Sequence, residues 1–194
     1  MSSISNDTKE AVLHAAAVAF SKIGFKKTSI DDIAKAAGVA KGTVYLAAES
    51  KEELFYQVIY REVRAWQAHC LRLVDPRATA DAILRVMAEE AARYITARPL
   101  LLDLLAGRLG EAMPRWTERF DDLRAIGRNN LTEVLRLGVR QGRFRPEIDV
   151  ERVASLLQDF QLAPWILRGN ASVEEIVANG RSAVDLLLHG LMCR

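Results

Sequence analysis

The sequence lacks the features that would mark a β-rich or membrane-spanning protein. No run of Val, Ile, Thr and aromatic residues alternates with polar residues between turn signals, so strands are not expected. The apolar runs are short: 100–102 stops at Asp103 and 186–188 stops at His189, whereas a membrane span needs about twenty apolar residues. The first ten residues also lack the cationic and then apolar pattern of a signal peptide. We therefore expect a helical protein in the cytoplasm.

Cysteine and histidine are scarce and scattered. Cys70 and Cys193 show neither metal nor redox spacing, which leaves buried, reduced thiols as the simpler interpretation. His14, His69 and His189 stand far apart, and no glycine-rich phosphate loop or nucleophile motif is present. We expect no metal site and no cofactor, and an enzyme is the least favoured class of function.

The residues that are present favour a folded helical protein. Half of the 194 residues are hydrophobic, which is enough for a sizeable core, and a chain of this length forms one large domain or two smaller ones. The formal net charge is +2, so the protein is not a polycation that coats nucleic acid through its overall charge. A local basic patch for DNA is compatible with that charge.

Apolar residues recur at helical spacing along almost the whole chain. Gly24 ends a first helix, and the segments 50–53 and 172–175 have the Ser-x-x-Glu pattern of the capping boxes that start helices. Pro164 is expected to kink the helix around it or to end it early. The pattern predicts further helices near 29–37, 41–47, 51–74, 79–97, 100–110, 114–141, 149–168 and 172–191.

Residues 29–47 have the pattern of a helix-turn-helix. A short amphipathic helix leads into Gly38, which reaches the left-handed conformation without a Cβ clash, and Val39 then plugs the angle between two helices. In such a motif the second helix lies in the major groove of DNA. The segment therefore predicts a unit that reads DNA.

The stretch from Ala16 to Phe55 strongly resembles the N-terminal motif of the tetracycline-repressor (TetR) family. The matching pieces are Gly24-Phe25, Thr28-Ser29, Asp32-Ile33-Ala34, Ala37-Gly38-Val39, Lys41-Gly42-Thr43-Val44-Tyr45 and Ser50-Lys51. The resemblance implies an all-α fold, with a three-helix DNA-binding domain at 1–50 and a larger helical ligand-binding and dimerisation domain at 51–194. It also implies a repressor that binds a palindromic operator as a homodimer and is released by a small-molecule effector.

The resemblance and the position of each side chain together predict which residues contact DNA. A helix N-terminus near Thr28 and Ser29 favours an anion such as phosphate, and Lys51 is expected to reach the DNA backbone from the start of the next helix. The alternative for each residue is a capped or solvated helix surface. The predicted set is Lys27, Thr28, Ser29, Ala40, Lys41, Gly42, Thr43, Tyr45 and Lys51.

Three alanines depart from the pattern of the family. The family usually has Ser at the position of Ala40, where it would cap the recognition helix, and an Ala cap costs about 0.5–2 kcal/mol. It usually has an aromatic residue or His at Ala47, and at Ala48 a Phe that packs under the motif. A cavity from Phe to Ala costs about 3–5 kcal/mol in a rigid core, so the surroundings of Ala48 are expected to have collapsed or refilled. Because of these alanines, a helical ligand-binding protein without DNA activity is the main alternative.

The two terminal helices are apolar on more than one face. On the first of them, one stripe contains Ala154 and Leu157, and another contains Leu156 and Phe160. A helix that packs only within its own domain needs a single stripe, so the second predicts a partner, unless the pair is buried inside a monomer. The family resemblance suggests a four-helix dimer interface. Its predicted residues are Leu157, Phe160, Gln161, Val184, Leu187, Leu188 and Leu191.

The middle helices are where the family keeps its ligand cavity. Aromatic residues and Met at helical spacing there are more often plain core, whereas a buried polar residue would be the stronger sign because it needs a partner. The expected effector is apolar or aromatic. The predicted lining residues are Trp66, His69, Leu104, Arg108, Met113, Trp116, Phe120 and Asn130.

Overall fold

The protein is built from α-helices. The computed structural model describes residues 4–75, 77–98, 100–101, 116–167 and 172–192. Within these residues the only pairing of extended backbone is an isolated bridge between Phe144 and Met192. The helices are α1 (Asn6–Lys27), α2 (Ile30–Ala37), α3 (Lys41–Ala47), α4 (Lys51–Leu73), α5 (Ala80–Thr96), α7 (Trp116–Arg140), α8 (Val150–Leu167) and α9 (Val173–Leu191). The predicted all-α fold is confirmed.

Helix ends lie where the sequence predicts them, because short polar residues and glycines set them. The Ser50 hydroxyl accepts from the Glu53 N–H at 3.0 Å, and Ser172 and Glu175 form a complete capping box. Gly38 ends α2 in the left-handed conformation with a φ of 68°, and Gly24, with a φ of 79°, breaks the helical geometry of α1. Pro164 does not end α8 early, since the helix continues to Leu167.

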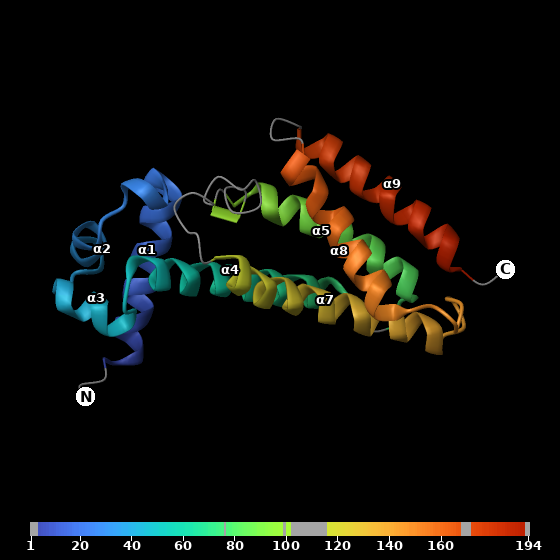
Figure 1. Ribbon diagram of the computed structural model, residues 1–194, viewed down its shortest axis with the longest axis horizontal. Coiled ribbons are helices and arrows are strands. Elements are labelled where there is room, and N and C mark those ends of the chain that lie inside the picture. The colour runs from blue at the N-terminus through green and yellow to red at the C-terminus, as the bar shows by residue number, and fades with distance from the viewer. Residues whose placement is uncertain (1–3, 76, 99, 102–115, 168–171, 193–194) are drawn as a thin grey trace.

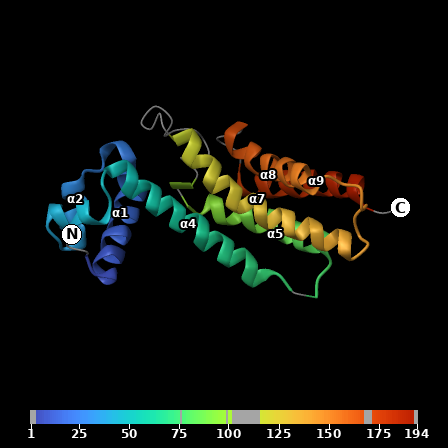
Figure 2. The ribbon, with the colours of Figure 1, turned by 60° about the horizontal axis from the view of Figure 1, so that its bottom comes forward.

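The helices divide into two packed groups that α4 connects (Figure 1). We call α1, α2 and α3 the head; it lies at one end of the molecule. The second group, the body, consists of α5, α7, α8 and α9, and its most extensive contacts join α5 to α9 and α7 to α8. Helix α4 leaves the head and runs beside α5 and α7, as the turned view in Figure 2 also shows.

The head has a core of aromatic side chains to which α4 contributes. Phe20, Phe25 and Phe55 pack with ring centroids 5.0–5.8 Å apart, and all three are buried. Phe55 belongs to α4, and its neighbours Leu54 and Ile59 are buried in the same cluster. Each such side chain stabilises the fold by about 1.5–3 kcal/mol. The first half of α4 is therefore fastened to the head.

The body has a second core made mostly of aliphatic side chains, together with Phe144. Its fully buried members include Leu84 of α5, Leu135 of α7, Leu157 of α8 and Leu188 of α9, so each helix of the body contributes to it. Among the described residues, no helix is long and apolar enough to cross a membrane.

Candidate functional site

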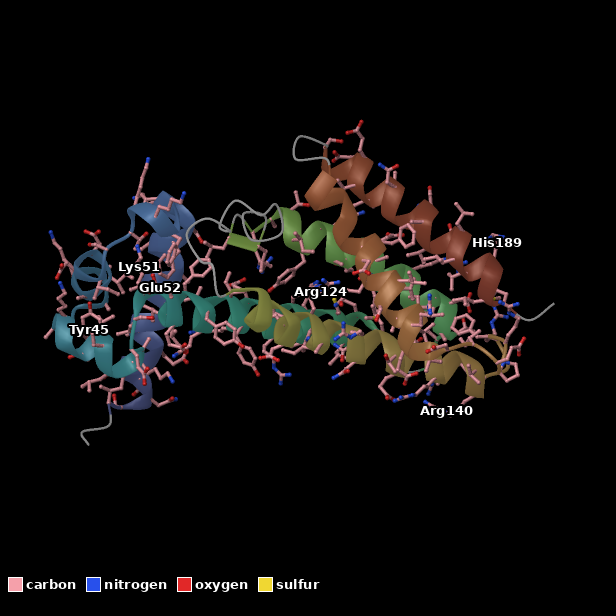
Figure 3. All side chains as sticks on the ribbon, viewed as in Figure 1. Tyr45, Lys51, Glu52, Arg124, Arg140 and His189 are labelled. Carbon is pink, nitrogen blue, oxygen red and sulfur yellow. The ribbon has the colours of Figure 1, made fainter. Side chains whose placement is uncertain are left out.

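Helix α3 presents one face to the head core and the other to solvent. Val44 and Ala47 are buried, whereas Lys41 and Gly42 are exposed and the Tyr45 side chain is 46% exposed. Figure 3 shows Tyr45 at the outer end of the head, away from the body. A short helix anchored on one face and open on the other has the shape required to enter the major groove.

The N-terminus of α3 has no side-chain cap. Ala40 occupies the N-cap position with extended backbone, and its carbonyl accepts from the Thr43 N–H at 2.9 Å. The predicted cap position is thus confirmed, and so is the lack of a hydroxyl there. Lys41, the first residue of α3, pairs with Asp31 at 2.8 Å, and this contact raises the pKa of the lysine.

Helix α2 already holds a carboxylate at its N-terminus. The Asp32 N–H donates to the Ser29 hydroxyl oxygen at 3.1 Å, while the Ser29 hydroxyl and N–H donate to Asp32 Oδ2 at 2.6 and 3.2 Å. These hydrogen bonds lower the pKa of Asp32. The Asp32 carboxylate therefore engages the N–H and hydroxyl of Ser29 at this helix end, and Ser29 itself stays exposed.

Two residues predicted to contact phosphate are used inside the head. Thr28 is only 2% exposed, and its hydroxyl donates to the Gly24 carbonyl at 2.8 Å. Lys51 Nζ donates to the carbonyls of Phe25 and Thr28 at 3.0 and 3.1 Å and lies 4.4 Å from the centre of the Phe25 ring. The Thr28 hydroxyl is therefore engaged inside the head, and Lys51 joins the start of α4 to the end of α1.

A second contact joins α4 to α3. Gln57 Nε2 donates to the Ala47 carbonyl at the end of α3, at 3.3 Å. Ala47 and Ala48 are both buried in the core that contains the three phenylalanines, so neither alanine lies on the exposed face of α3. Through Lys51 and Gln57, helix α4 holds both ends of the unit formed by α2 and α3.

A cavity of about 80 Å³ lies where α4 meets the body. The predicted residues Trp66 and Asn130 line it, whereas His69 instead faces Glu90, with Nε2 3.3 Å from a carboxylate oxygen. The predicted Leu104, Arg108 and Met113 lie outside the described residues, and Trp116 and Phe120 belong to the part of α7 described by its backbone alone. The lining residues are Val63, Trp66, Gln67, Cys70, Met87, Ile95, Leu101, Leu123, Arg124, Gly127, Asn130, Leu131, Gln158 and Gln161.

Four buried polar atoms of the described side chains have no hydrogen-bond partner, and all four belong to residues that line this cavity. They are Trp66 Nε1, Gln67 Nε2, Arg124 Nε and Gln158 Oε1. The sequence reasoning missed the last three residues. A glutamine on the apolar face of a helix, as Gln67 stands four residues after Val63, is the sign that would have found one of them.

The remaining polar groups near the cavity offer no reactive chemistry. Burial, and then the charge of Glu90, raise the pKa of the Cys70 thiol to about 11, so the thiol is neutral. The described residues contain no cluster of His, Cys, Asp and Glu that would hold a metal ion. The arrangement fits reversible binding of a small molecule.

The terminal helices divide their apolar residues between the core and the surface. Of the predicted interface residues, Leu157, Val184, Leu188 and Leu191 are buried within the chain itself, Leu187 packs partly against the same core, and Gln161 lines the cavity. Phe160 remains 48% exposed. Leu156 and Leu186, absent from the predicted set, are 44% and 77% exposed on the same two helices. The four buried residues thus belong to the core of the chain itself.

Known proteins resemble this chain in both sequence and structure. The family model described as bacterial regulatory proteins, tetR family, matches residues 12–58, from α1 into the first part of α4. The HTH-type transcriptional repressor KstR2 of Mycobacterium tuberculosis is 30% identical over 159 residues, which cover 79% of this chain and 78% of the repressor.

Solved structures share the fold over nearly their whole length. A transcriptional regulator from Cytophaga hutchinsonii superposes with a TM-score of 0.77 at 18% identity, covering 95% of this chain and 98% of that one. The regulator FadR of Bacillus subtilis, solved in complex with stearoyl-CoA, gives a TM-score of 0.73 at 20% identity and covers 94% and 98%. Both agree with the helix order described above.

Proposed function

The chain belongs to the TetR family of bacterial regulatory proteins, and from this membership we propose that it is a homodimeric repressor of a palindromic operator, released by a small molecule in the cavity. It is a DNA-binding transcriptional regulator, and its relatives are regulators rather than enzymes. The proposal divides the chain near residue 50 into a part that binds DNA and a part that binds the effector and the second subunit. The observation that carries it is helix α4, whose first half packs in the head core and whose second half lines the cavity.

The exposed face of α3 supports operator recognition by this helix. Gly42 and Tyr45 stand on its open side together with Lys41, and Thr43 is half-buried beside them. We propose that these four residues meet DNA, with Lys27, Ser29 and the backbone at Ala40 contributing contacts to phosphate. Thr28 and Lys51 act by holding the head in shape.

The exposed apolar residues of α8 and α9 support a homodimer. Three apolar side chains of these helices are exposed to solvent, namely Leu156, Phe160 and Leu186, while the other faces of the two helices form the core. Pairing α8 and α9 with the same helices of a second copy would form a four-helix interface and cover these side chains. A dimer also brings two heads to the two halves of a palindrome, about one helical turn of DNA apart.

Helix α4 supports a link between effector and DNA. Lys51 and Gln57 fasten it to the head, while Trp66 and Gln67, further along the same helix, line the cavity. Helix α4 packs more extensively against α1 than against α5 or α7. An effector that binds better to one orientation of α4 therefore shifts the two heads, and a tenfold loss of operator affinity requires only about 1.4 kcal/mol of coupling.

The apolar lining of the cavity supports an apolar or aromatic effector. Val63, Met87, Ile95 and Leu131 come from three helices and offer hydrocarbon surface around the few polar atoms. One relative of similar fold, FadR of Bacillus subtilis, binds stearoyl-CoA, and KstR2 of Mycobacterium tuberculosis is a ketosteroid regulator. Compact, mostly apolar molecules are therefore the first effectors to screen.

Selection of bound sequences from a random pool of duplex DNA tests the proposal. We expect enriched sites with two-fold symmetry, and we expect Tyr45→Ala to lose their enrichment while it retains salt-dependent binding to any duplex. Asymmetric sites would contradict the homodimer. No binding to duplex DNA, even at low salt, would favour a ligand-binding protein without DNA activity.

Sedimentation of two matched variants tests the dimer interface. Leu156→Glu places a carboxylate in the proposed interface and is expected to yield monomers, because a buried unpaired charge is strongly unfavourable. The control is Leu71→Glu, the same change at an exposed leucine of α4, which is expected to leave the dimer intact. If both variants sediment as the wild type does, the interface lies elsewhere.

A further inference from the structure

The cavity contains polar atoms that the described part of the chain leaves without partners. Gln67 is 7% exposed and Gln158 is 6% exposed, so neither amide reaches bulk water to any extent. An unpartnered buried polar group costs about 1–3 kcal/mol. Three residues of this kind beside one cavity, Gln67, Arg124 and Gln158, form a cluster that points to a ligand.

Two of these side chains are held in fixed orientations. Gln158 Nε2 donates to the Arg124 carbonyl at 2.8 Å, which identifies the amide nitrogen and leaves Oε1 as the unpartnered atom. Gly127 makes room for this amide, since a Cβ there would lie 2.8 Å from Nε2. Arg124 is held from its other end, because Nη2 pairs with Asp159, and its Nε–H remains buried and unpartnered. Figure 3 shows Arg124 in the middle of the molecule, between α4 and α8.

The unpartnered atoms are mostly donors. Gln67 Nε2 and Arg124 Nε each carry an N–H, and the Trp66 indole N–H lies beside the Cys70 thiol, a weak acceptor at best. Gln158 Oε1 is the one acceptor among them. A ligand that satisfies the unpartnered donors must therefore offer an acceptor oxygen, while the surrounding aliphatic side chains require the rest of it to be apolar.

We propose that the effector is a compact, mostly apolar molecule with a carbonyl or carboxylate oxygen, which accepts hydrogen bonds from Gln67 of α4 and Arg124 of α7. The inference rests on the proposed function, since it names the chemistry of the molecule that the cavity senses. It also gives that function a mechanism. The oxygen joins α4 to the body through hydrogen bonds, so occupancy fixes the orientation of the helix that carries the head.

The experiment compares two probes that differ in one oxygen. Cyclopentane and cyclopentanone are small and nearly equal in shape, and their dissociation constants are measured on the full-length protein by calorimetry. One net hydrogen bond is worth about 0.5–1.5 kcal/mol, so wild type is expected to prefer the ketone by about tenfold. Gln67→Met keeps the side-chain length, removes the donor and is expected to lower this preference by about threefold or more. Leu123→Met, in the same cavity, is the control and should keep the wild-type preference.

A second readout uses the protein without ligand. If Gln67 Nε2 has no partner, Gln67→Met raises the midpoint of thermal unfolding, whereas Leu123→Met does not. A lower midpoint for Gln67→Met would mean that the amide is satisfied within the protein and would overturn the proposal. The proposal would also be overturned if both probes bound the wild type equally or if neither bound. The second result is expected of a cavity that holds only water.

Two further measurements determine which chemical group carries the oxygen and whether its binding changes the affinity for DNA. Tighter binding of cyclopentanecarboxylate than of cyclopentanone assigns a carboxylate, and the reverse order assigns a neutral carbonyl; either result supports an acceptor oxygen. Operator affinity is then measured with and without the preferred probe. If the protein prefers the oxygen-containing probe but its operator affinity does not change, the proposed release from DNA is contradicted. The proposed binding of an acceptor oxygen in the cavity is still supported.

Discussion

The head and the cavity of the body treat their buried polar groups in opposite ways. In the head, the buried Thr28 hydroxyl and the half-buried Lys51 ammonium both have hydrogen-bond partners beside the aromatic core. Around the cavity, the amides of Gln67 and Gln158 are just as deeply buried, yet each has an atom without a partner.

This difference fits two different tasks. The head must keep its shape to read DNA, whereas the cavity of the body must change when it binds a ligand. A recognition helix reads DNA only if its position in the head is fixed, and dense packing with satisfied polar groups fixes it. A sensor gains affinity from groups that are satisfied only when the ligand is present. Helix α4 belongs to both parts, since Phe55 lies in the head core and Gln67 at the cavity.

The largest expected effect comes from opening the head core. Phe55→Ala removes the ring that contacts both Phe20 and Phe25, and it should lower the free energy of unfolding by about 3–5 kcal/mol. Denaturant unfolding measures the loss, and DNA binding should fall with it. Val18→Ala on the exposed face of α1 is the control, with an expected change within about 0.5 kcal/mol. A small effect of Phe55→Ala would contradict the rigid head.

The next effect tests whether polar groups of the body outside the cavity are satisfied. Burial favours the neutral form of Asp81, but hydrogen bonds from Arg143, Thr79 and Arg85 prevail and lower its pKa to about 2. A depressed native pKa gives stability that is present above the unfolded value of 3.8 and is lost as the pH falls toward 2.

Protonation of the Asp81 carboxylate is therefore expected to lower the free energy of unfolding of the wild type by about 2 kcal/mol between pH 4 and pH 2. The variant Asp81→Asn has no carboxylate there and is expected to lose about 2 kcal/mol less over the same range. Denaturant unfolding of both proteins at several pH values measures the difference. Parallel stability curves for the two proteins would show that Asp81 does not make these contacts in solution.

A smaller effect is expected at the junction of head and α4. Lys51→Met keeps most of the side-chain length but removes the ammonium from the carbonyls of Phe25 and Thr28, with a loss of about 1.5 kcal/mol of stability. Because these donors act inside the protein, the dependence of DNA binding on salt should keep its slope. A slope reduced by about one, with unchanged stability, would instead assign Lys51 to a phosphate.

The smallest effects come from a pair of opposite changes at the helix caps. Ala40→Ser supplies the missing hydroxyl at the start of α3 and should stabilise the protein by about 0.5–2 kcal/mol, whereas Ser29→Ala removes the cap of α2 and should cost a similar amount. Thermal unfolding of both variants measures the two shifts. Shifts of the same sign would mean that one of the two helices does not begin at the stated residue.

Much of the fold could be predicted from the sequence because its signals are local. Ser50, Ser172 and Gly38 set helix ends through hydrogen bonds and backbone conformations within a few residues, and the structure places the ends there. Gly24, predicted to end the first helix, breaks its geometry, but α1 continues to Lys27. The helix-turn-helix followed from the same local chemistry, and the cap position of Ala40 followed with it. Two apolar stripes on the terminal helices were equally visible.

The sequence by itself determined the helices, the helix-turn-helix and the apolar character of the helices in the middle of the chain. Only the tertiary structure decided which stripe of α8 is core, burying Leu157 and leaving Phe160 exposed, because periodicity shows that two faces exist but not which neighbour covers each. It also decided that the ammonium of Lys51 caps a distant helix, 23 and 26 residues earlier in the chain. Gln67 and Gln158 likewise meet at one cavity from helices far apart in sequence, and no local pattern encodes that meeting.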